Sequence, residues 1–237
     1  MRIAETKELH HRYGAVQVLE NVSLAIDSGH LVGLIGPNGC GKSTLMKILA
    51  GLIRNHGGEV LVDGKPVGPE SKAAVSYLPE STYLAEWMRP KDTLDVFTDF
   101  YADFDRVKAE GMLKRFKIPD KSIRTMSKGT QEKLQLILVM SRRAKLYLLD
   151  EPLGGIDPAS RAVMLDIIMS SYSEDSTIVI STHLLHDVER VFDRVLFMKD
   201  SRIIVDSDVD TLRAQTGCSL EEHFVSLYTD MAEGGAL

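Results

Sequence analysis

The chain has 237 residues, 44% of them hydrophobic, which is enough for a sizeable buried core and excludes disorder throughout. Its 28 Lys and Arg residues against 34 Asp and Glu residues give a formal net charge of -6, which argues against a broad nucleic-acid-binding surface. With 2 cysteines and no apolar run near the roughly 20 residues of a membrane-spanning helix, neither a disulfide framework nor a bilayer crossing is expected, and a reducing cytosol is indicated.

The first 80 residues are rich in short apolar segments that favour strands. These segments are VLENVSLAID (18–27), HLVGLIG (30–36) and GEVLVDGKPV (58–67). The Asp63-Gly64 dipeptide in the last segment is typical of a hairpin turn. We therefore expect a small β layer that leads into a core.

A helical stretch is predicted from Arg89 to about Arg143. Asp92 or Thr93 can cap its first helix, in which the apolar residues fall near one face. These apolar residues are Leu94, Phe97, Tyr101 and Phe104. The last helix, QEKLQLILVMSRR (131–143), is apolar almost all round over residues 134–140, so we expect it to be buried on several sides.

From Leu146 onward short β runs alternate with helical segments. They are LYLLD (146–150), a helix over 158–172, STIVIST (176–182), a helix from Leu184 and VLFMK (195–199). Such alternation predicts an α/β fold with a mostly parallel sheet and crossover helices. The helical stretch before it is then an insertion within one α/β unit.

The strongest motif runs from Gly36 to Ser43, GPNGCGKS, between an apolar strand and the helical segment LMKILAGL (45–52). It matches G-x-x-x-x-G-K-[ST], in which glycines let backbone N–H groups close around phosphates at a helix N-terminus. Lys42 would reach the β- and γ-phosphates and Ser43 would ligate Mg²⁺. The motif predicts a nucleotide-binding site.

Two adjacent acids, Asp150 and Glu151, follow the apolar strand 146–149. Open α/β sheets bind ligands at the carboxyl ends of their strands, although acids also gather at helix N-termini for local reasons. Together with the Gly-rich loop, Asp150 is predicted to hold Mg²⁺ and Glu151 to orient or deprotonate an attacking water.

His183 ends the predicted strand 176–182, where its side chain could meet the γ-phosphate. A lone histidine is more often structural. Of the 7 histidines, only this one lies at a predicted strand end beside the other chemistry, so we include it among the candidate catalytic residues.

Five segments then stand in one order: the Gly-rich loop, SKGTQ (127–131), LLDEP (148–152), Gly155-Ile156-Asp157 and His183. In this order the chain resembles the ATP-binding subunit of an ABC transporter over residues 1 to about 210. The resemblance implies a P-loop NTPase core with an N-terminal antiparallel β layer and an inserted α-helical subdomain. Within one domain of 237 residues, the core would comprise 1–80 and 146–210, the helical subdomain 81–145 and a C-terminal tail 211–237.

The resemblance also implies ATP and Mg²⁺ as cofactors and two subunits paired head to tail. Each ATP would lie between the Gly-rich loop of one subunit and the SKGTQ segment of the other, which corresponds to the family's signature motif at the start of a helix. Tyr13 would stack on adenine. The candidate nucleotide-binding residues are Tyr13, Gly36, Asn38, Gly39, Cys40, Gly41, Lys42, Ser43, Thr44, Ser127, Gly129 and Asp157. The candidate metal ligands are Ser43, Glu80 and Asp150, and the candidate catalytic residues are Glu151 and His183.

The chain departs from the family pattern at two places. The signature, usually LSGGQ, reads MSKGT, so that Lys128 and Thr130 replace a glycine and a glutamine. Lys128 could add charge near the phosphates or face solvent, and we slightly favour solvent. Glu80 in SYLPE stands where the family usually has glutamine. Both features resemble bacterial ABC-2-type exporter subunits.

A partner site is expected just after Glu80. Residues 83–104 hold six of the chain's 15 Phe, Trp and Tyr residues, most of which core packing explains. The family docks the coupling helix of its membrane subunit here, so the resemblance implies Tyr83, Leu84 and Trp87 as contacts with a permease. The chain would then lie on the inner face of the cell membrane, as a homodimer or a heterodimer with a related subunit.

The leading interpretation is an ATPase subunit that powers transport through a separately encoded permease. A soluble ABC ATPase that remodels a non-membrane assembly would share the same motifs. A P-loop kinase or other phosphotransferase is disfavoured, because the signature, Asp157 and His183 would then be coincidences. The sequence identifies neither the transported substrate nor the direction of transport.

Overall fold

The computed structural model describes residues 1–185 and 188–229. Its strands are β1 (Arg2–Tyr13), β2 (Val16–Asp27), β3 (Leu31–Ile35), β4 (Gly57–Val62), β5 (Lys65–Pro66), β6 (Val75–Leu78), β7 (Leu146–Asp150), β8 (Thr177–Thr182), β9 (Arg194–Lys199) and β10 (Arg202–Asp208). Its helices are α1 (Lys42–Leu49), α2 (Pro69–Ala73), α3 (Pro90–Phe100), α4 (Arg106–Arg115), the 3-10 turn η1 (Ile123–Thr125), α5 (Lys128–Met140), α6 (Pro158–Ser171), α7 (Val209–Thr216) and α8 (Leu220–Thr229).

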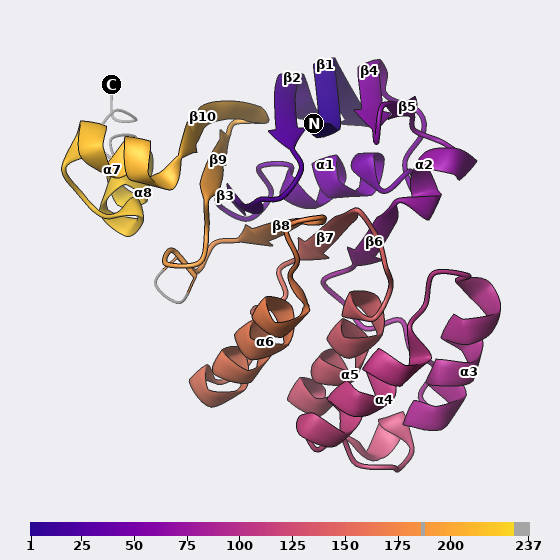
Figure 1. Ribbon diagram of the computed structural model, residues 1–237. Helices are drawn as coiled ribbons and strands as arrows, with labels where there is room; N and C mark the ends of the chain where they lie inside the picture. Colours follow the sequence, from indigo (N-terminus) through magenta and orange to yellow (C-terminus); the bar gives the residue numbers. More distant parts are fainter. Residues whose placement is uncertain (186–187, 230–237) are drawn as a thin grey trace.

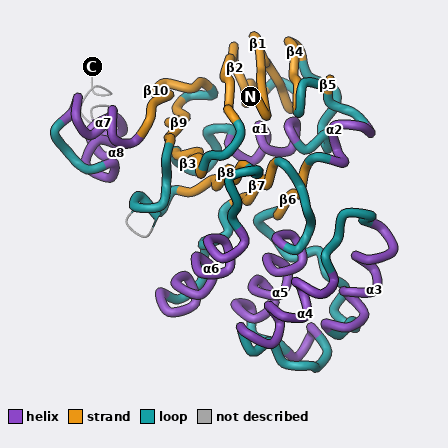
Figure 2. Tube along the Cα trace, in the orientation of Figure 1, coloured by secondary structure: helices purple, strands orange, loops and turns teal. Residues whose placement is uncertain are grey.

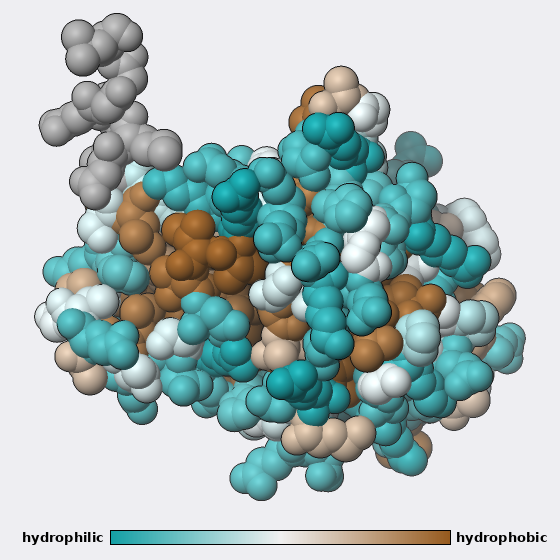
Figure 3. Space-filling model, turned by 90° about the horizontal axis from the view of Figure 1, so that it is seen from above, coloured by the Kyte–Doolittle hydropathy of each residue, from teal (hydrophilic) through white to brown (hydrophobic). Residues whose placement is uncertain are grey.

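An antiparallel sheet of four strands, in the order β2-β1-β4-β5, forms one layer of the molecule (Figure 1). The predicted hairpin is confirmed, because β4 pairs antiparallel with β5 around Asp63 and Gly64, both with positive φ. Figure 3 views the molecule from the end at which this sheet lies. The surface seen there is mostly hydrophilic, with an apolar area toward α7 and α8. Buried and exposed residues alternate along much of each long strand, as expected for a sheet with one face to solvent.

The second sheet has six strands in the order β10-β9-β3-β8-β7-β6. All its pairings are parallel except that of β10 with β9. Every residue of β3, β7 and β8 is buried, as continuous apolar strands covered on both faces require. The predicted α/β class with a mostly parallel sheet is confirmed.

Helix α1 lies between the two sheets, and α6 covers the opposite face of the six-stranded sheet (Figures 1 and 2). The apolar residues of α1 pack in one cluster with residues of both sheets, among them Leu45, Leu148 and Leu24. A second cluster joins the other face of the six-stranded sheet to α5 and α6. The loop before α1 is therefore clamped between two packed layers.

The predicted helical stretch forms α3, α4, η1 and α5, which lie apart from the antiparallel sheet (Figure 2). All seven residues from Leu134 to Met140 are buried, as predicted for the last helix. Of the two predicted cap residues, Asp92 does cap α3, but from within its first turn: α3 begins at Pro90, and the Arg89 amide donates to the Asp92 carboxylate at 2.8 Å. Pro90 sets the start because its ring favours the first helical position.

The helix predicted from Leu184 was wrong in the described part of this segment. Residues 184–185 and 188–192 form a loop and turns, and residues 186–187 lie outside the described residues. The Leu184 amide donates to the Thr182 hydroxyl at 2.9 Å, and the Val188 amide donates to the Leu185 carbonyl at 2.9 Å. The first of these is a bond from the backbone to a side chain, a kind that competes with helix formation.

Residues 209–229 form α7 and α8, and Leu212 and Leu220 join the core cluster of the six-stranded sheet. Within the described residues we find no helix with the length and apolar character needed to cross a bilayer. The division of the chain at residues 80, 145 and 210 remains a prediction.

Arg142 ties the helical layer to the six-stranded sheet. Its guanidinium donates to both carboxylate oxygens of Asp103 at 3.1 Å and to the Val75 carbonyl at 2.6 Å. It also lies 4.2 Å from the centre of the Tyr101 ring, in a cation–π geometry. The Arg142 side chain is buried, so these partners replace the water that it loses.

Arg142→Met is expected to lower the free energy of unfolding by about 1–3 kcal/mol, because the Val75 carbonyl would lose its buried donor and Asp103 its cation. Arg143→Met is the matched control, since Arg143 pairs with Asp105 at 2.8 Å on the surface and should change stability little. Urea unfolding of both variants checks the expectation, and similar losses in the two would contradict it.

Candidate functional site

The three predicted motifs meet at one edge of the six-stranded sheet. Strands β3, β8 and β7 are neighbours and run parallel, so their carboxyl ends lie together. The Gly-rich loop follows β3, Asp150 and Glu151 end β7, and His183 follows β8. Residues more than a hundred positions apart in the sequence thus form one site.

The Gly-rich loop folds around its own lysine. The Lys42 ammonium donates to the carbonyls of Gly36 and Pro37 at 2.8 and 3.1 Å, and its side chain is only 5% exposed. Gly41 has a φ of 111°, and a Cβ there would lie 2.5 Å from the Val18 carbonyl oxygen. Only glycine suits this position, where the loop enters α1.

Most of the candidate loop residues line one cleft of about 470 Å³. Its lining consists of Val18, Asn38, Gly39, Gly41, Lys42, Ser43, Thr44, Glu80 and Glu151. Gly36 and Cys40 form the inner side of the loop instead, since a Cβ at Gly36 would meet the Met198 carbonyl oxygen at 2.4 Å. Burial raises the pKa of the Cys40 thiol, so this thiol is a packing group rather than a reactive one.

Asp150 is 1% exposed, and three hydroxyl groups hold its carboxylate. Ser43 and Ser181 both donate to Oδ1, at 2.9 and 2.7 Å, and Tyr77 donates to Oδ2 at 3.2 Å. Burial is the main cause that raises the pKa of the Tyr77 hydroxyl, and the negative charge of Asp150 is the next. The hydroxyl therefore stays protonated and donates.

Carboxylate and hydroxyl oxygens are the ligands that Mg²⁺ prefers, so Ser43 and Asp150 fit a magnesium site. Among the residues described, no group of three or more His, Cys, Asp or Glu side chains is placed to hold a metal. A site with few protein ligands is what Mg²⁺ uses when phosphates and water complete its shell. Glu80, the third candidate ligand, lines the same cleft.

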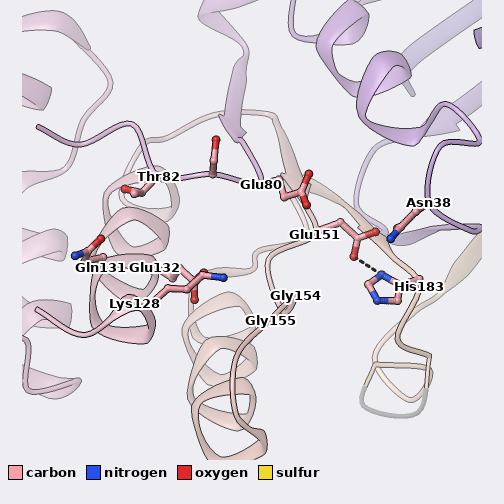
Figure 4. Close-up of a pocket in the computed structure, with 11 residues that line it drawn as sticks. Asn38, Glu80, Thr82, Lys128, Gln131, Glu132, Glu151, Gly154, Gly155 and His183 are labelled. Atoms are coloured by element: carbon pink, nitrogen blue, oxygen red, sulfur yellow. Dashed lines mark hydrogen bonds and ion pairs between the residues drawn. The ribbon is translucent and has the colours of Figure 1, made fainter.

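Glu151 lies between Lys42 and His183. Its bond to His183 is drawn in Figure 4. Its Oε1 is 3.3 Å from the Lys42 ammonium, and its Oε2 is 3.0 Å from Nδ1 of His183. The side chain is 8% exposed, and the residue has a φ of 47°, in the left-handed region that non-glycine residues seldom adopt. The backbone therefore aims this carboxylate at the loop lysine and the histidine.

A second cleft of about 590 Å³ lies between this edge and α5. Asn38, Glu80, Glu151 and His183 line one side, and α5 supplies Lys128, Gln131 and Glu132 (Figure 4). Lys128 lies 3.6 Å from Glu132 and is 70% exposed, so it faces both the cleft and solvent. Burial raises the pKa of the Glu132 carboxyl. Sequence analysis missed Gln131 and Glu132, although both follow Lys128 at helical spacing.

The remaining nucleotide-binding candidates are not among the residues that line these two clefts. Tyr13 is exposed at the end of β1, where it makes an edge contact with His11. Ser127 precedes α5 and shares a hydrogen bond of 2.8 Å with Thr130. Asp157 caps α6, and the hydrogen bond from the Ser160 amide lowers the pKa of its carboxyl.

Gly129 lies beside α6, since a Cβ there would be 3.5 Å from the Ser160 hydroxyl. Ser127, Gly129 and Asp157 therefore gather at the start of α5 and α6, which is a different place from the Gly-rich loop.

The three expected partner contacts differ in exposure. Trp87 is 72% exposed and Tyr83 is also exposed, while Leu84 packs against the apolar cluster of the helical layer. The Tyr83 amide donates to the side-chain carbonyl of Gln135 on α5 at 3.1 Å. The exposed aromatics thus sit on a segment that is fixed to the helix lining the second cleft.

Comparisons with known proteins agree with the motifs. A family model described as ABC transporter matches residues 19–154. The ABC transporter ATP-binding protein YtrB of Bacillus subtilis is 33% identical over 215 residues, which cover 89% of this chain and 74% of YtrB. The lantibiotic transport ATP-binding protein SrtF of Streptococcus pyogenes is 31% identical over 206 residues, covering 86% of this chain and 90% of SrtF.

The fold is also similar to a solved structure of an ATP binding subunit of an ABC transporter. The TM-score is 0.84 at 29% sequence identity, and the match covers 95% of this chain and 99% of the other. The similarity therefore extends over nearly the whole chain, including both sheets and the helical layer.

Gly41→Ala is expected to destabilise the loop more than Gly39→Ala. Both residues have positive φ, which costs an L-residue about 1–2 kcal/mol. Only at Gly41 would the new methyl group meet backbone within 3 Å, and such overpacking adds about 1–3 kcal/mol. Urea unfolding checks the difference, and equal losses in the two variants would refute the close approach of Val18.

Proposed function

Because the chain belongs to the family of ABC transporter ATP-binding proteins, we propose that it binds ATP with Mg²⁺ and hydrolyses it. Hydrolysis would power transport through a separately encoded membrane permease, with two ATP-binding subunits pairing around ATP. One observation carries the proposal: Glu151 contacts both Lys42 and His183, and it lies next to Asp150, whose carboxylate accepts hydrogen bonds from hydroxyl groups.

Lys42 would bind the β- and γ-phosphates. Its ammonium already has backbone carbonyls and one carboxylate around it, so phosphate oxygens would have to replace the Glu151 oxygen 3.3 Å away. Binding would then release Glu151 from Lys42 while His183 still holds the other carboxylate oxygen at 3.0 Å.

The freed Glu151 would orient the attacking water and accept its proton. His183 would fix the direction of that carboxylate through the bond to Oε2. Ser43, Asp150 and Glu80 would hold Mg²⁺, which when bound neutralises charge on the β- and γ-phosphates.

The positions of Ser127, Gly129 and Asp157 support a second subunit. These residues do not line the cleft around the Gly-rich loop of their own chain, so they are free to meet the ATP of a partner. Tyr13 would stack on adenine from its exposed place at the end of β1. The partner is either a second copy or a related ATP-binding subunit.

Docking on a permease is proposed for Tyr83 and Trp87, whose exposed rings are typical of interface residues. Leu84 would support them from the apolar cluster of the helical layer. The similarity to YtrB and SrtF, which are named as ATP-binding proteins of transporters, supports this partner and with it a place on the inner face of the cell membrane.

Glu151→Gln is expected to bind ATP but to lower its hydrolysis about 100-fold or more, since the amide cannot accept a proton from water. Phosphate release and ATP binding by the purified variant check this. The variant should also form an ATP-dependent dimer in size-exclusion chromatography. Turnover like that of the unaltered chain would contradict the role of Glu151.

Trp87→Glu is expected to release the chain from membranes that contain its permease, because burying an unpaired charge in an interface costs about 2–5 kcal/mol. ATP binding should persist, since Trp87 is 72% exposed and lies outside both clefts. Co-sedimentation of the tagged chain with membranes is the measurement.

Ile204→Glu is the matched control, because Ile204 is an exposed apolar residue on β10, at the opposite edge of the six-stranded sheet from β6. It should leave membrane association unchanged. Equal release by both variants would contradict a docking site at Trp87. An unaltered chain that copurifies only with non-membrane proteins would favour remodelling of a soluble assembly over transport.

A further inference from the structure

Ser181 is a fully buried polar residue at the end of an apolar strand. It lies in β8, directly opposite Asp150 in the parallel pairing with β7. A hydroxyl buried in such a place is costly unless its hydrogen bonds are made. Both of its bonds go to the acids that end β7, so they connect Ser181 to the proposed chemistry.

The first bond fixes the metal-binding carboxylate. The Ser181 hydroxyl donates to Oδ1 of Asp150 at 2.7 Å, the same oxygen that accepts from Ser43 at 2.9 Å. Tyr77 holds the other oxygen at 3.2 Å, so both oxygens are restrained from different strands. Without Ser181, the one hydroxyl of the described residues left on Oδ1 would be that of Ser43, itself a proposed metal ligand.

The second bond fixes the backbone of Glu151. The Glu151 amide donates to the Ser181 hydroxyl oxygen at 2.9 Å and also to its carbonyl at 3.2 Å. Glu151 has a φ of 47°, a conformation that persists only where neighbouring groups hold it. Ser181 holds that conformation, which directs the carboxylate toward Lys42 and His183.

We propose that Ser181 is a positioning residue for ATP hydrolysis, because one hydroxyl sets both the metal-binding Asp150 and the water-orienting Glu151. The proposal rests on the proposed function of the chain. Ser181 is fully buried and lines neither of the two clefts. It acts by fixing the position of Asp150 relative to Glu151. These acids are adjacent at the end of β7, but one is proposed to bind metal and the other to orient water.

The test compares Ser181→Ala with Ser76→Ala in the purified full-length chain. Ser76 is a matched control, since it is equally buried, lies in a strand of the same sheet and donates one hydrogen bond, to the Val139 carbonyl at 2.9 Å. Three quantities are measured: thermal unfolding, binding of a fluorescent ATP analogue with and without Mg²⁺, and the rate of hydrolysis against Mg²⁺ concentration.

Ser181→Ala is expected to bind the analogue without Mg²⁺ within about twofold of the unaltered chain, because the phosphate loop is intact. The gain in affinity on adding Mg²⁺, and the maximal rate of hydrolysis, should each fall by about 10–100-fold, the usual effect of removing a group that orients a metal ligand. Ser76→Ala should change neither quantity. Ser181→Thr, which keeps the hydroxyl, should restore part of the rate.

Unchanged Mg²⁺ dependence and rate in Ser181→Ala would overturn the proposal, as would an equal loss in Ser76→Ala. If Ser181→Ala does not fold, Ser181→Cys fills the same space with a weak hydrogen-bonding group, and the same outcomes decide. An unaltered chain without Mg²⁺-dependent hydrolysis would instead refute the proposed function. An active chain that tolerates Ser181→Ala and Ser181→Cys would refute only the role of Ser181.

Discussion

The carboxylate of Asp150 is the constraint on which the site depends. It is 1% exposed, and a buried carboxylate without hydrogen-bond donors would be too costly to keep. Its donors come from the start of α1, from β6 and from β8, so satisfying this one group fixes three segments against the end of β7. The Gly-rich loop is therefore held at the end of β7 by the same carboxylate that is proposed to bind Mg²⁺.

The ion pair of Lys42 and Glu151 is another buried contact at the carboxyl ends of β3 and β7. It joins the loop to the strand end, and it occupies the two side chains that are proposed to act on phosphate and on water. A ligand that competes for Lys42 thereby changes the surroundings of Glu151. In the proposed function, this contact of 3.3 Å is what would link nucleotide binding to hydrolysis.

Local sequence signals predicted the elements that carry the motifs, but not their neighbours. GPNGCGKS and LYLLDE could be placed at strand ends because glycine, lysine and apolar runs have strong local preferences. Ser181 and Tyr77 became visible only through the pairing of β8 and β6 with β7, since their roles depend on register between distant strands.

Strand β1 was missed because its bulges break the alternation of apolar and polar residues, as the φ of 50° at Glu8 and the register shifts show.

In the proposed function, phosphate and Glu151 compete for Lys42. The most direct test is the equilibrium affinity of the chain for a non-hydrolysable fluorescent ATP analogue. We expect Glu151→Gln to bind the analogue several-fold more tightly than the unaltered chain, because an uncharged amide oxygen holds the Lys42 ammonium less strongly than a carboxylate does. In a Lys42→Ala background the same substitution should give a much smaller gain, since the pair is already broken. Equal affinities of the unaltered chain and Glu151→Gln, or the same gain in both backgrounds, would contradict the account.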